Sequence, residues 1–276
     1  SHLALQHGLA ACWSTPIKAN DGRVLGTFAF YYRQPYDPDS FHHRLVEVIV
    51  HLCALALERE EARNRIRRLA FYDDLTGLPN RSLLHAQADQ AITAANHHGQ
   101  TMAVMFIDLD RFKQINDSFG HPGGDELLRT VARRLQEETG PMDIVGRLSG
   151  DEFVVILNRC DVPAASERSE RILRTLGLPL ALGDLEIRPS ASIGISIFPH
   201  DGNDMDSLLH HADVAMYQAK HNGRNRVRFY SSEMDECAQE RMALEAALRE
   251  ALEQGQLQLH YQPQIEIRSG RLHSVE

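Results

Sequence analysis

The chain has 276 residues, of which 24% are charged and 43% hydrophobic, as expected for a globular protein of one or two domains. Its formal net charge of −9, without a long basic run, disfavours nucleic-acid binding. The four cysteines form no CxxC pair, so a zinc ribbon or disulfide framework has little support, and we expect a reduced, cytoplasmic chain. The apolar run at residues 46–57 is too short to span a bilayer, and no signal-peptide pattern opens the chain, so no membrane partner is expected.

The first seventy residues predict a hairpin followed by a long helix. Residues 9–32 alternate like two strands around the turn Asn20-Asp21-Gly22. Asp39 or Ser40 can cap the helix at residues 40–70. Its apolar positions follow the spacing of a coiled-coil seam, interrupted by Arg59: Leu52, Leu55, Ala62, Ile66 and Leu69. This helix is either a spacer packed on its own domain or the stalk of a parallel dimer.

Residues 71–232 alternate imperfectly between helices and strands and include a hairpin. We expect helices at residues 81–95, 124–138, 163–176 and 206–221, and strands at residues 102–108, 143–158 (a hairpin), 186–199 (a strand pair) and 227–230. This order predicts an α+β, ferredoxin-like sheet flanked by helices and preceded by the long connecting helix.

Two acidic segments predict a site for a hard cation. Asp151 and Glu152 lie in the turn of the hairpin at residues 143–158, where adjacent carboxylates repel each other unless a cation or hydrogen-bond donors lie beside them. From these residues alone a solvated loop is an equal alternative. Asp108 ends the apolar strand Met102–Ile107, where ligands of α/β sheets gather. Oxygen ligands of this kind suit Mg²⁺ or Mn²⁺.

Four ordered motifs resemble the GGDEF domain, the diguanylate cyclase family that condenses two GTP into cyclic di-GMP. They are Asp73-Asp74-Leu75-Thr76-Gly77-Leu78-Pro79-Asn80-Arg81, the segment from Phe106 to Leu128, Ser149 to Phe153, and Ala212 to Lys220 with Gly223-Arg224-Asn225-Arg226. Four motifs in the family's order are far more specific than one. The resemblance implies a nucleotidyl-cyclase-like fold.

The resemblance also implies a role for particular residues. Asp108, Asp151 and the carbonyl of Leu109 would bind the metal, and Asp151 or Glu152 would assist deprotonation of the attacking hydroxyl. The residues implied in GTP binding are Asn116 and Asp125 at the guanine, the backbone amides of Phe112 and Lys113 at the phosphates, and Lys220 and Arg224 at the phosphates. For His121, contact with the nucleotide and a turn-stabilising role are equally open.

The chain departs from the family pattern at two positions. Ser149 replaces the first glycine of the motif, which predicts reduced or retained activity. At the family's product-inhibition site, Arg-x-x-Asp, Gly140 stands where the arginine belongs and Asp143 is kept. A missing guanidinium predicts weak feedback inhibition.

The flanking segments resemble parts of two other families. Residues 9–28 are similar to the final strands of GAF sensory domains, and residues 256–267 to the opening of an EAL phosphodiesterase domain. We therefore divide the chain into a partial GAF-like domain (1–39), a connecting helix (40–70), a GGDEF domain (71–232), and a linker with the truncated start of an EAL domain (233–276).

The leading hypothesis for function is a Mg²⁺-dependent diguanylate cyclase. Each site would hold one GTP, so the product requires two subunits facing one another, and a homodimer is the expected partner. The alternative is a catalytically weak GTP-binding module that regulates a following phosphodiesterase. A purely structural dimerisation segment ranks last, because it leaves the acidic site unexplained.

Overall fold

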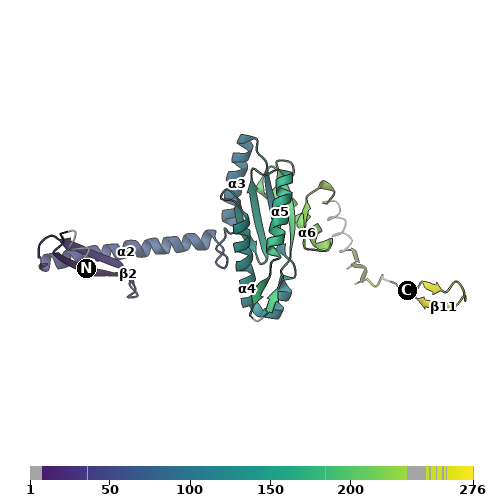
Figure 1. Ribbon diagram of the computed structural model, residues 1–276, viewed down its shortest axis with the longest axis horizontal. Helices are drawn as coiled ribbons and strands as arrows, with labels where there is room; N and C mark the ends of the chain where they lie inside the picture. Colours follow the sequence, from purple (N-terminus) through teal and green to yellow (C-terminus); the bar gives the residue numbers. More distant parts are fainter. Residues whose placement is uncertain are drawn as a thin grey trace. The chain divides into compact units, whose positions relative to one another are not determined.

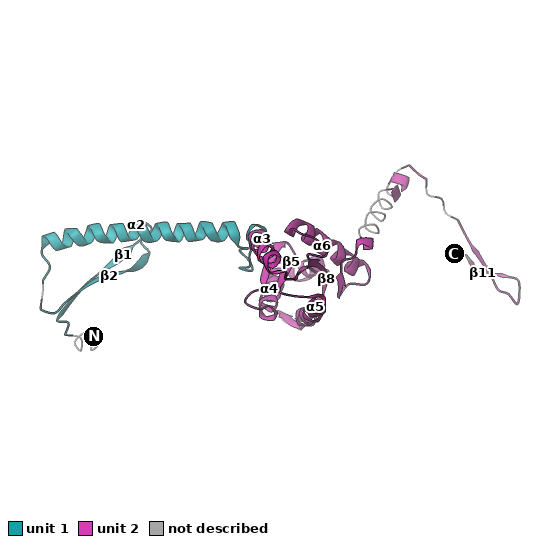
Figure 2. Ribbon diagram, turned by 90° about the horizontal axis from the view of Figure 1, so that it is seen from above, with its two compact units in different colours: residues 1–83 teal, residues 84–276 magenta. Residues whose placement is uncertain are grey.

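A computed structural model describes residues 8–35, 37–183 and 185–234 and, towards the C-terminus, residues 247–248, 250–252, 254–256, 258 and 260–275. The chain divides into two compact units, Ser1–Leu83 and Leu84–Glu276 (Figure 2). Each unit is described by itself.

The first unit contains a hairpin and a long helix (Figure 1). Strand β1 (Ala11–Lys18) pairs antiparallel with β2 (Val24–Tyr32), as the sequence predicted. Helix α2 (Ser40–Phe71) begins at its N-cap Asp39, whose carboxylate accepts hydrogen bonds from two first-turn amides. The hairpin contacts this helix through an ion pair of 2.7 Å between Arg23 Nη2 and Glu61 Oε2. Asn20 donates its backbone N–H to Glu58 over 2.8 Å.

Helix α2 leaves most of its apolar side chains exposed, including Leu52, Leu55, Ile66 and Leu69. By length and composition this helix is also able to cross a membrane. Only 11% of its most apolar 18-residue segment is buried. The apolar run at residues 46–57 alone is too short to cross a membrane; the whole helix is long enough. One helix of this kind is weak support for a membrane span, because helices that pack against a partner have the same composition.

The second unit is built on a five-stranded sheet in the order β4-β5-β3-β8-β9. Its elements are α3 (Arg81–His98), β3 (Met102–Leu109), α4 (Phe112–Glu138), β4 (Ile144–Ser149), β5 (Glu152–Asn158), α5 (Val162–Leu176), β6 (Leu180–Leu182), β7 (Leu185–Ile187), β8 (Ala191–Phe198), α6 (Met205–His221) and β9 (Arg226–Phe229). Strand β3 is central and antiparallel to β5 and β8, whereas β8 and β9 are parallel. This is the α+β sheet that the sequence predicted.

The two faces of the sheet are covered by different helices. Helices α3 and α6 enclose a core with β3 and β5, which includes Leu84, Ile92, Phe106, Val154, Leu208 and Met216. Helices α4 and α5 pack on each other, and α5 also contacts β3, β8 and β9. All eight residues of β3 are buried, because both of its faces are covered. This rigid strand holds the residue at its C-terminal end in a fixed position.

Two predicted boundaries were wrong. Helix α4 begins at Phe112 and not at residue 124; it continues through a kink where Gly120 has φ 69° and ψ 174°. Gly120 and Pro122 resemble loop residues, but glycine permits this conformation, and proline fits the first turn of the helical segment after the kink. The predicted strand pair at residues 186–199 does not form. Instead β7 pairs with β6 in a separate hairpin, and β8 joins the central sheet.

The C-terminal segment is described only in part. The amphipathic pattern of residues 244–252 also predicts a helix; residues 244–246 and 249 lie outside the described residues, and the others are helical. Strands β10 (Pro263–Ile265) and β11 (Leu272–Val275) form an antiparallel hairpin.

Candidate active site

The end of strand β3 carries a buried ion pair. Asp108 is 6% exposed, and its Oδ2 lies 2.7 Å from Nζ of Lys220 in the last turn of α6. The pairing of β3 with β5 places Asp108 opposite Glu152, the first residue of β5. The N–H of Leu109 donates to the carbonyl of Asp151 over 3.3 Å. The sheet therefore brings together the two acidic segments that the sequence had separated by more than forty positions.

The turn between β4 and β5 is held by its own side chains. Gly150 has φ 47° and provides the left-handed residue of this turn, whereas Ser149 is not among the positive-φ residues. Serine at the first motif position is therefore free of the strain that a left-handed conformation would cause. The Ser149 hydroxyl donates to Glu152 Oε2 over 2.7 Å. Arg147 donates from Nε and Nη2 to the Gly150 carbonyl over 3.0 and 2.6 Å.

The carboxylates of this site are electrostatically strained. Burial raises the pKa of Asp108 to about 6; the hydrogen bond from Lys220 opposes this shift, and the nearby charges of Asp151 and Glu152 add to it. Burial also raises the pKa of Asp151, again with a contribution from Glu152. Lys220 and, at Asp151, Arg147 do not fully offset the burial and the mutual repulsion of these carboxylates, so the site favours an additional cation.

These residues fit a magnesium ion by their chemistry. Among the described residues, no group of three or more His, Cys, Asp or Glu side chains has metal-binding geometry. Asp108 and Asp151, with the Leu109 carbonyl, form a smaller set made only of oxygen atoms. Mg²⁺ commonly takes one or two carboxylates and completes its shell with water and substrate phosphates. A bound cation would favour the charged forms of both carboxyl groups, whose pKa values burial raises.

The residues expected at the guanine lie on both sides of the kink in α4. Asn116 packs directly on Gly124: a Cβ added there would lie 2.0 Å from Asn116 Oδ1 and 3.2 Å from Phe112 Cζ. Asp125 follows Gly124 and is half-buried, as is Asn116. Only glycine at position 124 leaves this space for the amide. His121 lies exposed after the kink, where both of its proposed roles stay open.

The two residues expected at the phosphates have different surroundings. Lys220 contacts Asp108, whereas Arg224, with φ 57°, lines a different cavity described below. Phe112 and Lys113 form the first turn of α4, where backbone N–H groups have no intrahelical acceptor. Such a helix start is a suitable position for anionic phosphates.

Two residues, Asp110 and Arg147, have clear structural roles that the sequence did not predict. Asp110 is buried and accepts hydrogen bonds from the hydroxyls of Ser190 and Ser192, each over 2.7 Å, and from the amide of Asn225 over 3.0 Å. It therefore ties the end of β3 to β8 and to the loop after α6. Its position directly after the buried strand, in Asp108-Leu109-Asp110, is the sequence pattern that could have indicated this role. For Arg147, which bonds the turn, no local pattern gave a signal.

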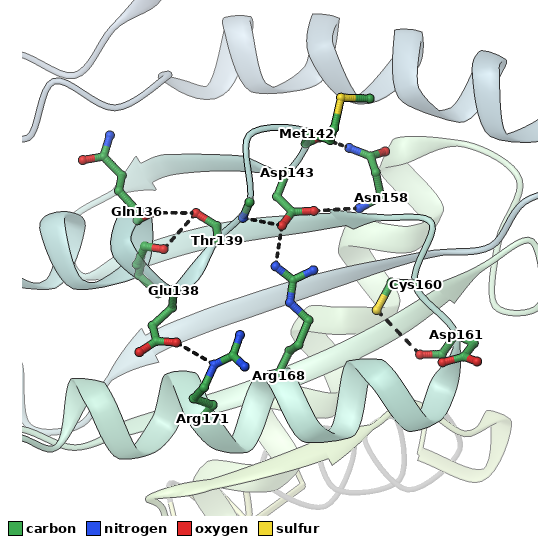
Figure 3. A network of polar contacts seen from close by, with 12 residues as sticks. Gln136, Glu138, Thr139, Met142, Asp143, Asn158, Cys160, Asp161, Arg168 and Arg171 are labelled. Carbon is green, nitrogen blue, oxygen red and sulfur yellow. Dashed lines mark hydrogen bonds and ion pairs between the residues drawn. The ribbon is translucent and has the colours of Figure 1, made fainter.

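The second departure from the family pattern lies in a network of polar contacts (Figure 3). Asp143 pairs with Arg168 of α5 and accepts hydrogen bonds from the backbone N–H of Gly140 over 2.7 Å and of Asn158 over 3.1 Å. Beside it, Arg171 Nε lies 2.7 Å from Glu138 Oε2. Position 140 lacks the arginine of the family pattern, and the carboxylate of Asp143 is bonded to Arg168 and to two backbone N–H groups of its own chain.

Comparison with known proteins agrees with this architecture. The model of the family "Diguanylate cyclase, GGDEF domain" matches residues 70–226, and that of the GAF domain matches residues 1–58. The chain is 41% identical over 222 residues to the bifunctional diguanylate cyclase/cyclic di-GMP phosphodiesterase MucR of Pseudomonas aeruginosa, covering 80% of this chain and 32% of MucR. It is 38% identical over 184 residues to the diguanylate cyclase TpbB of the same species, covering 66% of this chain and 42% of TpbB.

Solved structures show the same fold. The isolated GGDEF domain of P. aeruginosa TpbB (YfiN) matches with a TM-score of 0.59 at 38% identity, covering 61% of this chain and 99% of that domain. The coiled coil and GGDEF domain of DgcB from Caulobacter crescentus, in complex with c-di-GMP, matches with a TM-score of 0.59 at 28% identity, covering 69% and 100%. The chain spans about a third of the length of curated relatives such as MucR. It belongs to the GGDEF domain family, with a GAF match at its N-terminal end.

Proposed function

We propose that this chain contains a diguanylate cyclase domain that condenses two GTP into cyclic di-GMP and pyrophosphate. The observation that carries this proposal is the convergence of Asp108, Asp151 and Glu152 beside Lys220, near the C-terminal end of the central strand β3. A structural role for so many charged groups is disfavoured, because their burial and mutual repulsion are unfavourable for folding. The similarity to TpbB and MucR, whose names state this activity, supports the proposal.

In this proposal, different residues bind the guanine base, bind the phosphates, hold the metal and accept the proton. Asn116 and Asp125 would bind the N1–H and N2–H₂ edge of guanine, which adenine lacks. Amides at the start of α4, Lys220 and Arg224 would bind phosphates. Asp108, Asp151 and the Leu109 carbonyl would hold Mg²⁺, which would neutralise phosphate charge and favour departure of pyrophosphate. Asp151 or Glu152 would accept the proton of the attacking 3′-hydroxyl.

A homodimer follows from the reaction, because each domain binds one GTP and both must react. The exposed apolar side chains of α2 offer a surface for such pairing, and its similarity to a coiled coil with a GGDEF domain supports this assignment. A segment that is similar to the opening of an EAL domain follows, and several relatives are named as phosphodiesterases, including NbdA of P. aeruginosa and PdeR of Escherichia coli. These names favour the second candidate, a GTP-binding domain that regulates a phosphodiesterase.

Incubation with GTP and Mg²⁺, followed by chromatography for cyclic di-GMP, tests the proposal. The control pair is Asp151→Ala, at the proposed metal site, and Asp117→Ala, an exposed aspartate of α4. We expect product from the wild type and from Asp117→Ala and none from Asp151→Ala. If the wild type binds GTP as a dimer and still forms no product, the regulatory role replaces the enzymatic one.

A further inference from the structure

A second cavity lies beside the N-terminal half of α4, with a volume of about 440 Å³. The residues of α4 that line it are Gln114, Ile115, Ser118 and Phe119, which share one face of the helix. Asn116 and Asp125 are not among the lining residues. The cavity is therefore separate from the proposed guanine contacts.

Three arginines from three segments line this cavity: Arg111 before α4, Arg188 between β7 and β8, and Arg224 after α6. Within the part of the chain that the structure describes, none of their guanidinium groups forms an ion pair or a hydrogen bond. These three exposed guanidinium groups therefore offer unpaired hydrogen-bond donors and positive charge to an anion in the cavity. In a chain with a net charge of −9, this local excess of positive charge is a specific feature.

The acidic residue that lines the cavity forms no ion pair with these arginines. Asp110 also lines it, but both of its carboxylate oxygens accept hydrogen bonds from Ser190, Ser192 and the Asn225 amide. With three arginines and one aspartate, the lining has a formal charge of +2.

We infer that this cavity binds a small phosphorylated molecule. Guanidinium groups match the oxygen atoms of a phosphate in charge and in hydrogen-bond geometry. The lining also contains apolar side chains, among them Ile115 and Phe119, which suit an organic group attached to the phosphate. The volume lies in the lower part of the range of roughly 300–1,000 Å³ that small-molecule sites have, which fits a ligand the size of a mononucleotide.

Binding measured without activity tests this inference independently of the cyclase proposal. Isothermal titration calorimetry in EDTA would use two probes, inorganic pyrophosphate and adenosine 5′-monophosphate. Adenine lacks the edge that Asn116 and Asp125 would bind, and EDTA removes the metal that would hold phosphates at Asp108 and Asp151. The test variant is Arg111→Gln with Arg188→Gln, because neither residue belongs to the proposed substrate site. The matched control is Arg129→Gln with Arg174→Gln, two exposed arginines on the surfaces of α4 and α5.

We expect at least one probe to bind the wild type and the control with equal affinity, and the test variant to lose tenfold or more. A preference for the mononucleotide would identify an organic phosphate, and a preference for pyrophosphate an inorganic one. The single substitution Arg188→Gln, in an exposed loop, should show a smaller loss and guards against misfolding of the double variant. Absence of binding to the wild type, or equal binding to all variants, would overturn the inference.

Discussion

The hydroxyl of Ser149 donates a hydrogen bond of 2.7 Å to Glu152 Oε2, so the residue that departs from the family motif is bonded to the acid three positions later. This contact holds one carboxylate of the proposed catalytic pair in a fixed orientation. A glycine at position 149 could not make it. The departure therefore acts on the position of Glu152 and not through backbone strain.

Ser149→Gly should raise the rate of cyclic di-GMP formation, because it releases Glu152 to approach the substrate hydroxyl. A net hydrogen bond of about 0.5–1.5 kcal/mol corresponds to a change of about two- to tenfold in kcat. Ser149→Ala, which removes only the hydroxyl, should have the same effect. Steady-state kinetics on both variants would measure it. A lower kcat in either variant would show that the hydrogen bond supports catalysis.

Asp108→Asn should abolish activity and stabilise the metal-free protein at pH 7. The pKa of Asp108 is raised from 3.8 to about 6, so the folded state holds the proton more tightly than the unfolded state. The stabilisation from its neutral form is complete below pH 3.8 and is lost as the pH rises through about 6. The charged form then costs up to about 3 kcal/mol, which asparagine avoids.

Urea unfolding in EDTA at pH 4 and pH 7 would measure this difference. The gain in unfolding free energy of Asp108→Asn should be largest at pH 7 and close to zero at pH 4. Asp117→Asn, at an exposed position of α4, is the matched control and should show no such dependence. Equal gains at both pH values would contradict the assigned cause.

Gly124→Ala should weaken GTP binding through Asn116. The added Cβ would lie 2.0 Å from Asn116 Oδ1, the end of a side chain that can move aside without disrupting the fold. Loss of one guanine contact would raise KM for GTP about tenfold and change kcat little. Asn116→Ala should give the same KM, and the double variant no further increase. Additive effects would show that Gly124 acts by another route.

Cyclic di-GMP should inhibit this chain weakly, because position 140 lacks an arginine and Asp143 already pairs with Arg168. Gly140→Arg should strengthen inhibition. A Cβ there would lie 3.3 Å from Asp143 Oδ2, a side-chain atom that can yield, and Gly140 does not need a left-handed conformation. Titration of the product into the cyclase assay would measure the change. Ordinary affinity of the wild-type chain for cyclic di-GMP would disprove the prediction.

Leu55→Glu should weaken dimerisation, and Arg59→Leu should strengthen it. Leu55 is 47% exposed on α2, and Arg59 interrupts the same apolar seam. Burying a leucine side chain in a partner helix is worth about 1.5–3 kcal/mol. Analytical ultracentrifugation over a range of concentrations would measure both. Arg63→Glu, outside the seam positions, is the control, and a dissociation constant unchanged in all three variants would exclude α2 from the interface.

Local patterns in the sequence were enough to predict the long helix α2, the hairpin β4–β5, the buried strand β3 and the carboxylates at their ends. These features depend on hydrophobic periodicity, turn residues and motif spacing, which are properties of neighbouring residues. The first segment of α4, from Phe112 to the kink at Gly120, was missed because Gly120 and Pro122 are local breakers, and they were taken to mark a loop before the helix. The separate hairpin β6–β7 was missed because strand pairing depends on contacts distant in the sequence.

Only the tertiary structure decided which charged and polar side chains contact one another. It placed Lys220 on Asp108, and Arg224 in a cavity with Arg111 and Arg188. It also bonded Ser149 to Glu152 and Asp143 to Arg168. The physical reason is that side-chain direction at the ends of strands and helices is set by the register of the sheet and the orientation of the helices packed on it, and residue type alone specifies neither.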